Sequence, residues 1–245
     1  MPRPNRIQYP GAWYHVMNRG ASRTDVFRST YDRQVFLSLV ESATRRTGAE
    51  VHAYCLMGNH YHLLIRTPNP TLDQTMHLLA GPYARHFNDS YDRDGRLCRD
   101  RYHALLIDSE NYLLAVSRYI HRNPAAFGIV RLADYTWSSY PAYLGIRPPQ
   151  DWLELDETLA MAGGRFQLEA LVESSLPTET DKFYERTRRP AVLGSKTFAA
   201  EARQASRLTI DLGAWPLRRD RGLAPEVLVD VDMAGHVGGR DTGDT

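Results

Sequence analysis

Residues 54–67 read YCLMGNHYHLLIRT, and this stretch decides the fold that we predict. It holds two histidines, His60 and His62, in a short apolar run, which is typical of a buried β-strand. Because side chains alternate between the two faces of a strand, His60 and His62 would share one face. Two neutral imidazoles at that spacing can bind one metal ion, although two histidines packed in a polar pocket fit this pair alone equally well.

The chain before and after this stretch alternates between strand and helix patterns. Strand patterns lie at residues 12–19, 50–57, 59–66 and 101–108. Helix patterns have N-terminal caps at Ser29 or Thr30, at Thr71, and at Ser109 or Asp108. Gly48 ends the first helix, a Gly81–Pro82 bend lies inside the second, and Pro124 stops the third near Asn123.

The order β-α-β-β-α-β predicts an α+β fold of the ferredoxin-like, split βαβ type. Its core is a four-stranded antiparallel sheet with two helices on one face, and the helix from Ser109 is an addition to it. Residues 125–153 are rich in aromatics, proline and glycine, which indicates an irregular segment packed on the core. Residues 155–173 and 179–207 contain patterns of short amphipathic helices, with a break at Pro190–Gly194. Residues 232–245 are predicted to be disordered.

At 245 residues, with 42% hydrophobic and 24% charged residues, the chain is long enough for one well-cored domain, with or without a smaller appendage. No run approaches the roughly 18 apolar residues of a membrane helix. The first residues, MPRPNRIQYPGAWY, lack the apolar core of a secretion signal. Cys55 and Cys98 have no motif partners, so we expect no disulfide framework and a cytoplasmic location.

Charge is divided unevenly along the chain, although the net charge is only +1. Residues 1–150 contain 18 Arg and 12 Asp+Glu, a balance of +6, whereas the remaining 95 residues contain 12 Lys+Arg and 17 Asp+Glu, a balance of −5. Such an asymmetry hints that the basic half contacts nucleic acid. All of the cations in this half are arginines, which suits bidentate phosphate contacts, although codon bias explains the preference more simply.

The third predicted helix, SENYLLAVSRYIHRNP at 109–124, carries further polar residues of interest. Tyr119 and Asn123 are four residues apart, so they project from one face of the helix, one turn apart. A tyrosine at the edge of an apolar stripe, with its hydroxyl in water, is nevertheless the commoner arrangement. The helix alone therefore leaves the role of Tyr119 open.

Three segments together resemble the IS200-like family of single-tyrosine HUH transposases, and most closely its REP-associated branch. They are MGNHYHLLI at 57–65, GRLCRDRYHALLI at 95–107 and YLLAVSRYIHRNPAAFGIV at 112–130, and the segments AWYHVMNRG and WSSYPAYLG fit the same pattern. The two-histidine element alone is weak evidence, but its combination with Tyr-Ile-His-x-Asn-Pro in the matching fold order is specific. The resemblance covers about residues 8–165, so we expect a transposase domain at 1–165 and an extension of unknown role at 166–231.

The resemblance implies a role for each matching residue. His60 and His62 match the paired metal ligands of the family, Tyr119 matches its nucleophile, and Asn123 stands where the family has a third polar ligand. Tyr112 is the competing nucleophile, and Tyr119 is preferred because no polar residue follows Tyr112 by one turn. Some relatives complete each active site with the tyrosine helix of a second copy, so monomer and homodimer both stay open.

The residue types fit the chemistry that the resemblance implies. Two imidazoles and an amide oxygen suit Mg²⁺ or Mn²⁺, and the ligand types do not exclude Zn²⁺. The family acts on single-stranded DNA near a hairpin. Tyrosine attack on a metal-polarised phosphodiester would give a 5′-phosphotyrosyl link and a free 3′-hydroxyl, and the reverse attack would join strands without ATP.

Further side chains suit contacts with the DNA, because arginines neutralise phosphates and aromatic rings stack on unpaired bases. The residues that we assign to these contacts are Arg96, Arg99, Arg101, Arg118, Arg122, Tyr61 and Tyr102. For any one arginine, a solvated surface role fits equally well. The family often has glutamine at the position of Arg99 and a bulky apolar or aromatic residue at that of Cys98, which can alter substrate contacts without touching the metal site.

Three alternatives stand beside the enzyme. A domesticated protein could bind DNA hairpins without cleaving them, although the two histidines, Tyr119 and Asn123 are all present. A replication initiator or relaxase of the wider HUH group is the second, but such proteins are often larger and carry a helicase or a third histidine. An unrelated ferredoxin-like binding module with structural histidines is the third, and it predicts that Tyr119 lies far from the histidine pair.

Overall fold

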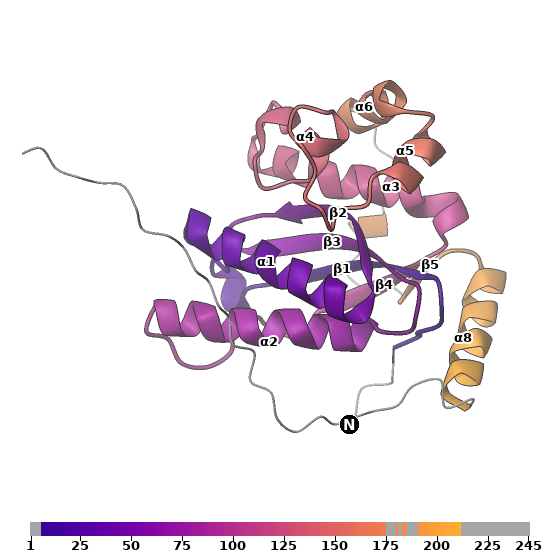
Figure 1. Cartoon of the computed structure of the whole chain (residues 1–245), viewed down its shortest axis with the longest axis horizontal. Helices are drawn as coiled ribbons and strands as arrows, with labels where there is room; N and C mark the ends of the chain where they lie inside the picture. The colour runs from indigo at the N-terminus through magenta and orange to yellow at the C-terminus, as the bar shows by residue number, and fades with distance from the viewer. Residues whose placement is uncertain (1–5, 175–179, 181–182, 185–190, 212–245) are drawn as a thin grey trace, which may run out of the picture. The chain divides into compact units, whose positions relative to one another are not determined.

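The computed structural model describes residues 6–174, 180, 183–184 and 191–211, and its elements follow the predicted order (Figure 1). The strands are β1 (Ala12–Arg19), β2 (Glu50–Leu56), β3 (His60–Thr67), β4 (His103–Ile107) and β5 (Val192–Leu193). The helices are α1 (Thr30–Thr47), α2 (Leu72–Ser90), α3 (Ser109–Arg122), α4 (Tyr140–Tyr143), α5 (Asp156–Ala162), α6 (Arg165–Glu173) and α8 (Lys196–Asp211), with short 3-10 helices at Ala21–Arg23, Asn123–Phe127 and Leu132–Asp134.

The sheet has the strand order β2-β3-β1-β4-β5. Its first four strands are antiparallel, in the order of the predicted ferredoxin-like fold. The prediction of a four-stranded, wholly antiparallel sheet is corrected by β5, which pairs with β4 in parallel. The sequence predicts only a break between helices at Pro190–Gly194. It does not predict β5, because a strand of two residues is too short to show alternation.

Local signals set the helix ends. The side chain of Ser29 accepts a hydrogen bond from the backbone of Asp32, whose carboxylate accepts one from the backbone of Ser29, so α1 begins with a capping box. Gly48 ends α1 with a φ of 69°, a left-handed conformation that glycine adopts without a steric penalty. Helix α2 continues through Pro82, and α3 gives way to a 3-10 turn that contains Pro124.

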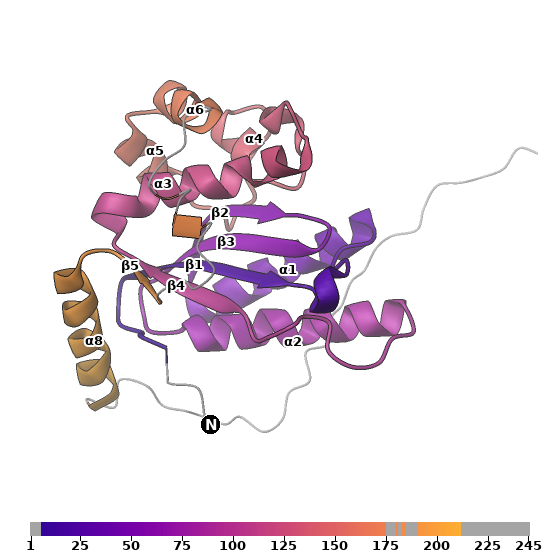
Figure 2. The same cartoon turned by 180° about the vertical axis from the view of Figure 1, so that it is seen from behind.

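The two faces of the sheet are covered by different helices. Helices α1 and α2 lie on one face, and α3 with α4 to α6 lies on the other (Figures 1 and 2). Neighbouring residues of β3 divide accordingly, since Leu63 packs in the core under α1 and α2, whereas Leu64 packs with Leu113 and Val116 of α3. His60 and His62 share the face of Leu64, which is the face that α3 covers.

The segment after α3 is largely irregular and packs on the core, as predicted. Tyr140 and Tyr143 are fully buried, and the hydroxyl of Tyr143 donates to the backbone carbonyl of His52. In the part of the chain that the structure describes, no helix is both long and apolar enough to cross a membrane. The predicted disordered tail at 232–245 lies outside the described residues, as does part of the segment 179–207.

Burial of His121 makes the stability of the fold depend on pH. His121 is fully buried in α3, where Nε2 pairs with the hydroxyl of Ser139, and burial lowers its pKa to about 3. The pKa in the unfolded chain is about 6.5. The neutral ring therefore contributes its full stability above pH 6.5 and loses it as the pH falls from 6.5 toward 3. At pH 5 the expected loss in the free energy of unfolding is about 2 kcal/mol.

Urea unfolding at pH 7 and pH 5 measures this loss. In His121→Gln the decrease in stability between the two pH values should be smaller than in the unmodified chain by about 2 kcal/mol. His77 is exposed on α2, so His77→Gln should leave the decrease unchanged. Equal decreases in all three proteins would contradict the expectation.

Candidate active site

Strand β3 and the C-terminal end of α3 bring four of the predicted site residues to one cavity. His60 and His62 project from β3, Tyr119 projects from the last turn of α3, and Asn123 follows that turn. The cavity encloses about 450 Å³. The residues that line it are Met17, Asn18, Arg19, His60, His62, Arg99, Asp100, Arg101, His103, Tyr119, Asn123, Ala126 and Phe127.

The imidazoles of His60 and His62 converge on the amide of Asn123. His60 Nε2 lies 2.8 Å from Asn123 Oδ1, and Asn123 Nδ2 lies 3.1 Å from His62 Nε2. All three side chains are buried. Among the described residues, no group of three or more His, Cys, Asp and Glu side chains is arranged to hold a metal ion. A metal centre at this point would therefore use the amide of Asn123 as its third side-chain ligand.

Tyr119 lies beside this group. Its ring centroid is 5.8 Å from that of His62 and 5.9 Å from that of His15, and both contacts are edge to face. An unrelated module with structural histidines predicts a distant tyrosine, and these distances do not fit it. Tyr112, the competing nucleophile, is not among the residues that line the cavity. One chain supplies the tyrosine, both histidines and the asparagine.

A second layer of side chains, which the sequence analysis missed, holds the histidines from behind. Asn59 Oδ1 lies 2.6 Å from Nδ1 of His60, and His15 Nε2 lies 2.8 Å from Nδ1 of His62. His15 Nδ1 is in turn hydrogen-bonded to the hydroxyl of Tyr184. Contacts to Nδ1 fix the plane of each ring, so that both Nε2 atoms stay directed at Asn123.

Tyr184 also contacts the candidate nucleophile directly. Its ring stacks on that of Tyr119, with centroids 3.8 Å apart and an angle of 17° between the planes. The alternation of β1 could have suggested His15, which shares the mixed face of Trp13 and Met17. No sequence pattern marks Tyr184, since it lies in a segment with no assignable motif.

Burial keeps His60 in the form that binds metals. Burial lowers the pKa of His60 to about 4. The contact with Asn123 opposes this shift, and the positive charge of Arg19 adds to it. His60 is therefore neutral at neutral pH, with one unprotonated ring nitrogen. Both ring nitrogens face amide oxygens, Nδ1 that of Asn59 and Nε2 that of Asn123, and a neutral ring donates to only one of them. With the proton on Nδ1, the lone pair on Nε2 is available to a cation that Asn123 Oδ1 also binds.

Three of the predicted phosphate contacts lie at cavities. Arg99 and Arg101 are exposed at the rim of the site just described. Arg96 and Arg101 line a second cavity on the other face of the sheet. These positions leave the guanidinium groups accessible to a strand of DNA.

Arg118 and Arg122 instead turn toward α6. Arg118 is 2% exposed and donates to the backbone carbonyls of Leu171 at 3.0 Å and Ser174 at 2.7 Å. Arg122 donates to the carbonyl of Val172 at 2.7 Å. The buried guanidinium of Arg118 binds carbonyl groups and does not reach a phosphate, whereas Arg122 is partly exposed and its contact with DNA stays a prediction. The helical pattern gave no sign that α6 would cover this face.

Replacing Arg118 by alanine is expected to lower the free energy of unfolding by about 3 kcal/mol, because two buried carbonyl groups lose their donor. Arg99→Ala, at an exposed position, should change it by less than about 0.5 kcal/mol. Urea unfolding gives both values. Where both variants are folded, only Arg99→Ala should reduce the salt dependence of DNA binding, and the reverse result would restore Arg118 as a phosphate contact.

Tyr61 and Tyr102, the predicted stacking residues, line the second cavity and not the one that holds Tyr119. Tyr61 lies between the two histidines of β3, so its ring points to the opposite face and is buried there. The hydroxyl of Tyr102 donates to the carboxylate of Asp73, and the guanidinium of Arg6 lies 3.8 Å from the centre of its ring. The two tyrosines therefore cannot stack on a base beside Tyr119.

Comparison with known proteins gives the following matches. The family model described as "Transposase IS200 like" matches residues 8–123, a segment that runs from before β1 to Asn123. No curated protein sequence matches the chain. Similar solved structures include a REP-associated tyrosine transposase bound to a REP hairpin, 17% identical, with a TM-score of 0.48 over 64% of this chain and 96% of that one. They also include a candidate transposase of Deinococcus radiodurans R1, 19% identical, with a TM-score of 0.35 over 49% of this chain and 97% of that one.

Proposed function

We propose that this chain, whose residues 8–123 match the IS200-like transposase family, nicks single-stranded DNA near hairpins and transfers strands through a covalent 5′-phosphotyrosyl link. One observation carries the proposal. Tyr119 lies against His62 in the same cavity in which His60 and Asn123 converge. A nucleophile and a set of metal-binding groups thus face one space that a phosphodiester could enter.

In the proposed cleavage, the phenolic oxygen of Tyr119 attacks phosphorus, and the bond from phosphorus to the 3′-oxygen breaks. The products are a tyrosine linked to the 5′-phosphate and a 3′-hydroxyl, which takes up a proton as the phenol loses one. In strand transfer, a 3′-hydroxyl attacks the same phosphorus and the tyrosine leaves as the phenol. Each step exchanges one phosphoester bond for another, so neither step needs ATP.

His60, His62 and Asn123 fit a divalent cation, and we propose Mg²⁺ or Mn²⁺. Both Nε2 atoms must then be unprotonated, so each ring carries its proton on Nδ1, within hydrogen-bond distance of Asn59 or His15. A bound ion would polarise the phosphate and stabilise the leaving 3′-oxygen. Arg99 and Arg101, at the rim, would neutralise phosphates of the flanking strand.

Incubation with hairpin-bearing single-stranded oligonucleotides and Mn²⁺, followed by denaturing electrophoresis, tests the proposal. A protein–DNA adduct that survives denaturation, carries the fragment on the 3′ side of the nick and is absent with a chelator is expected. A labelled strand with a 3′-hydroxyl should then be joined to that fragment. Failure to form an adduct with any of a set of hairpins, in Mg²⁺ or Mn²⁺, would overturn the proposal.

The same experiment separates two alternatives. Tight binding of hairpins without an adduct would favour a domesticated DNA-binding protein. Nicking without transfer to a second strand would favour an initiator or relaxase of the wider HUH group. Because one chain supplies every group of the site, the proposal does not need a homodimer.

A further inference from the structure

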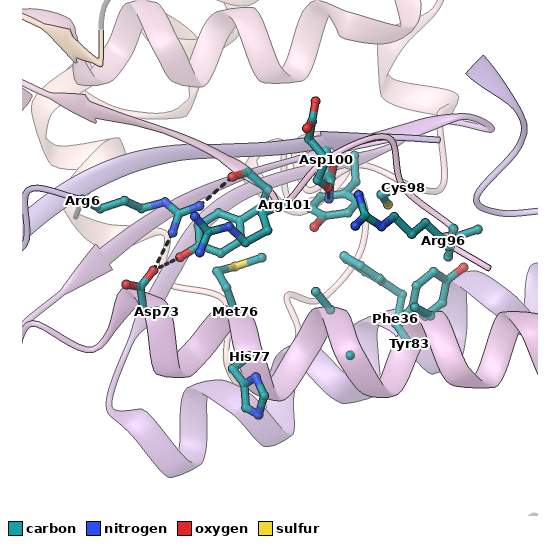
Figure 3. Close-up of a pocket in the computed structure, with 17 residues that line it drawn as sticks. Arg6, Phe36, Asp73, Met76, His77, Tyr83, Arg96, Cys98, Asp100 and Arg101 are labelled. Carbon is teal, nitrogen blue, oxygen red and sulfur yellow. Dashed lines mark hydrogen bonds and ion pairs between the residues drawn. The ribbon is translucent and has the colours of Figure 1, made fainter. Parts of the chain in front are cut away.

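A second cavity opens on the face of the sheet that α1 and α2 cover, beneath the loop that leads into β4 (Figure 3). It encloses about 800 Å³, within the range of roughly 300–1,000 Å³ that is usual for small-molecule sites. Its inner wall is apolar and aromatic, with Phe36 from α1 and Met76 and Tyr83 from α2. Arg96 and Arg101 extend over it from the loop (Figure 3).

Several polar groups in this cavity lack a partner. The hydroxyl of Tyr61 is buried and has no hydrogen-bond partner within the described residues. Leaving such a group unpaired costs about 1–3 kcal/mol, which a ligand with a polar edge would recover. In the described part of the chain, Arg96 and Arg101 make no hydrogen bond and no ion pair. The cavity therefore offers an apolar wall, one buried hydroxyl and two available cations.

Three further polar side chains of the cavity, Arg6, Asp73 and Tyr102, are paired with one another. Figure 3 shows Arg6 bound to Asp73, and the hydroxyl of Tyr102 donates to the same carboxylate. The pKa of the Cys98 thiol is raised to about 11 by burial, so this cysteine stays protonated and unreactive at neutral pH. The chemistry of the cavity is that of binding and not of catalysis.

The second cavity and the candidate active site meet at the end of β1. Asn18, Asp100 and Arg101 line both of them. Just before β4, the backbone of residues 97–99 bonds to that of residues 19–21, so Asp100 and Arg101 form the bridge between the two faces of the sheet. A strand whose phosphate lies beside Tyr119 can pass over this bridge and reach the second cavity.

We propose that the second cavity binds one unpaired nucleotide of the same DNA strand that is cleaved at Tyr119. A flat base with a polar edge matches the apolar wall and the hydroxyl of Tyr61, and its phosphate matches Arg96 and Arg101. This inference rests on the proposed function, because it takes single-stranded DNA as the substrate. A nucleotide away from the scissile bond would then contribute separately to the affinity for DNA and to the selection of its sequence.

The test uses Tyr119→Phe, which binds without cleaving, and hairpin oligonucleotides whose single-stranded tail carries one abasic site at successive positions. Fluorescence anisotropy should reveal one tail position at which loss of the base weakens binding about tenfold. The added substitution Ala80→Trp, from α2 into the cavity, should weaken binding of the intact tail and abolish this dependence. Gln74→Trp, exposed on the same helix and outside the cavity, is the matched control.

A milder variant guards against misfolding. Tyr61→Phe removes only the unpaired hydroxyl, so its free energy of unfolding should not fall, while the abasic effect at the selected position should shrink several-fold. Arg96→Ala should reduce the salt dependence of binding, whereas Arg85→Ala, exposed on α2 outside the cavity, should not.

The outcomes separate this inference from the proposed function. Equal abasic effects with and without Ala80→Trp, or no binding of any tailed hairpin, would overturn the nucleotide site. If the unmodified chain still formed its adduct in that case, the proposed function would stand. A selective abasic effect without any adduct would leave the nucleotide site and refute cleavage.

Discussion

Replacing Tyr119 by phenylalanine is expected to slow formation of the covalent protein–DNA adduct by at least about a thousandfold, because it removes the attacking oxygen. The ring, its stacking on Tyr184 and its edge contact with His62 would remain. Affinity for the uncleaved hairpin should therefore change little. Quantitative electrophoresis of the adduct, together with anisotropy of labelled DNA, measures the two effects separately.

Two other tyrosines provide the controls for this experiment. Tyr112→Phe should form the adduct at nearly the normal rate, because Tyr112 does not line the cavity. Tyr184 is the more demanding control, because its ring stacks on Tyr119 and its hydroxyl is hydrogen-bonded to His15, which places a second phenol beside the candidate nucleophile. Loss of the adduct in Tyr184→Phe, with retention in Tyr119→Phe and mapping of the linkage to Tyr184, would make Tyr184 the nucleophile.

Local patterns predicted the parts of the fold that depend on neighbouring residues. The period of two in β3 predicted that His60 and His62 share a face, and Ser29 and Gly48 marked the two ends of α1. The spacing of four between Tyr119 and Asn123 is likewise a property of one helix. In each case a single element with known geometry carried the inference.

Long-range packing produced the features that the sequence did not reveal. His15 reaches His62 only because β1 and β3 pair in the register that sets Met17 opposite His62, and no local pattern determines a register. Arg118 is buried because α6 docks over α3, which composition alone cannot indicate. The two-residue strand β5 forms only because β4 already supplies a ladder to join.

Replacing His62 by alanine is expected to abolish metal-dependent adduct formation, with a loss of at least about a thousandfold, because the cation would keep only His60 and Asn123 as side-chain ligands. Calorimetric titration with Mn²⁺ gives a readout that is independent of cleavage, and it should show no saturable site in this variant. Gln74→Ala, at an exposed position on α2 outside both cavities, should leave both measurements unchanged. Normal Mn²⁺ binding by His62→Ala would remove His62 from the metal site.

The variant His15→Ala tests whether His15 positions the metal ligand His62 and does not itself bind the metal. His15 is hydrogen-bonded to Nδ1 of His62, so its loss should free the ring of His62 to rotate without removing Nε2. The expected result is an Mn²⁺ affinity weaker by about 10–100-fold, with adduct formation restored at higher Mn²⁺ concentration. His15→Gln, which keeps a polar group near Nδ1, should recover part of the affinity. A merely structural role would instead lower the maximal rate at every Mn²⁺ concentration, so the shape of the titration decides whether His15 acts through His62.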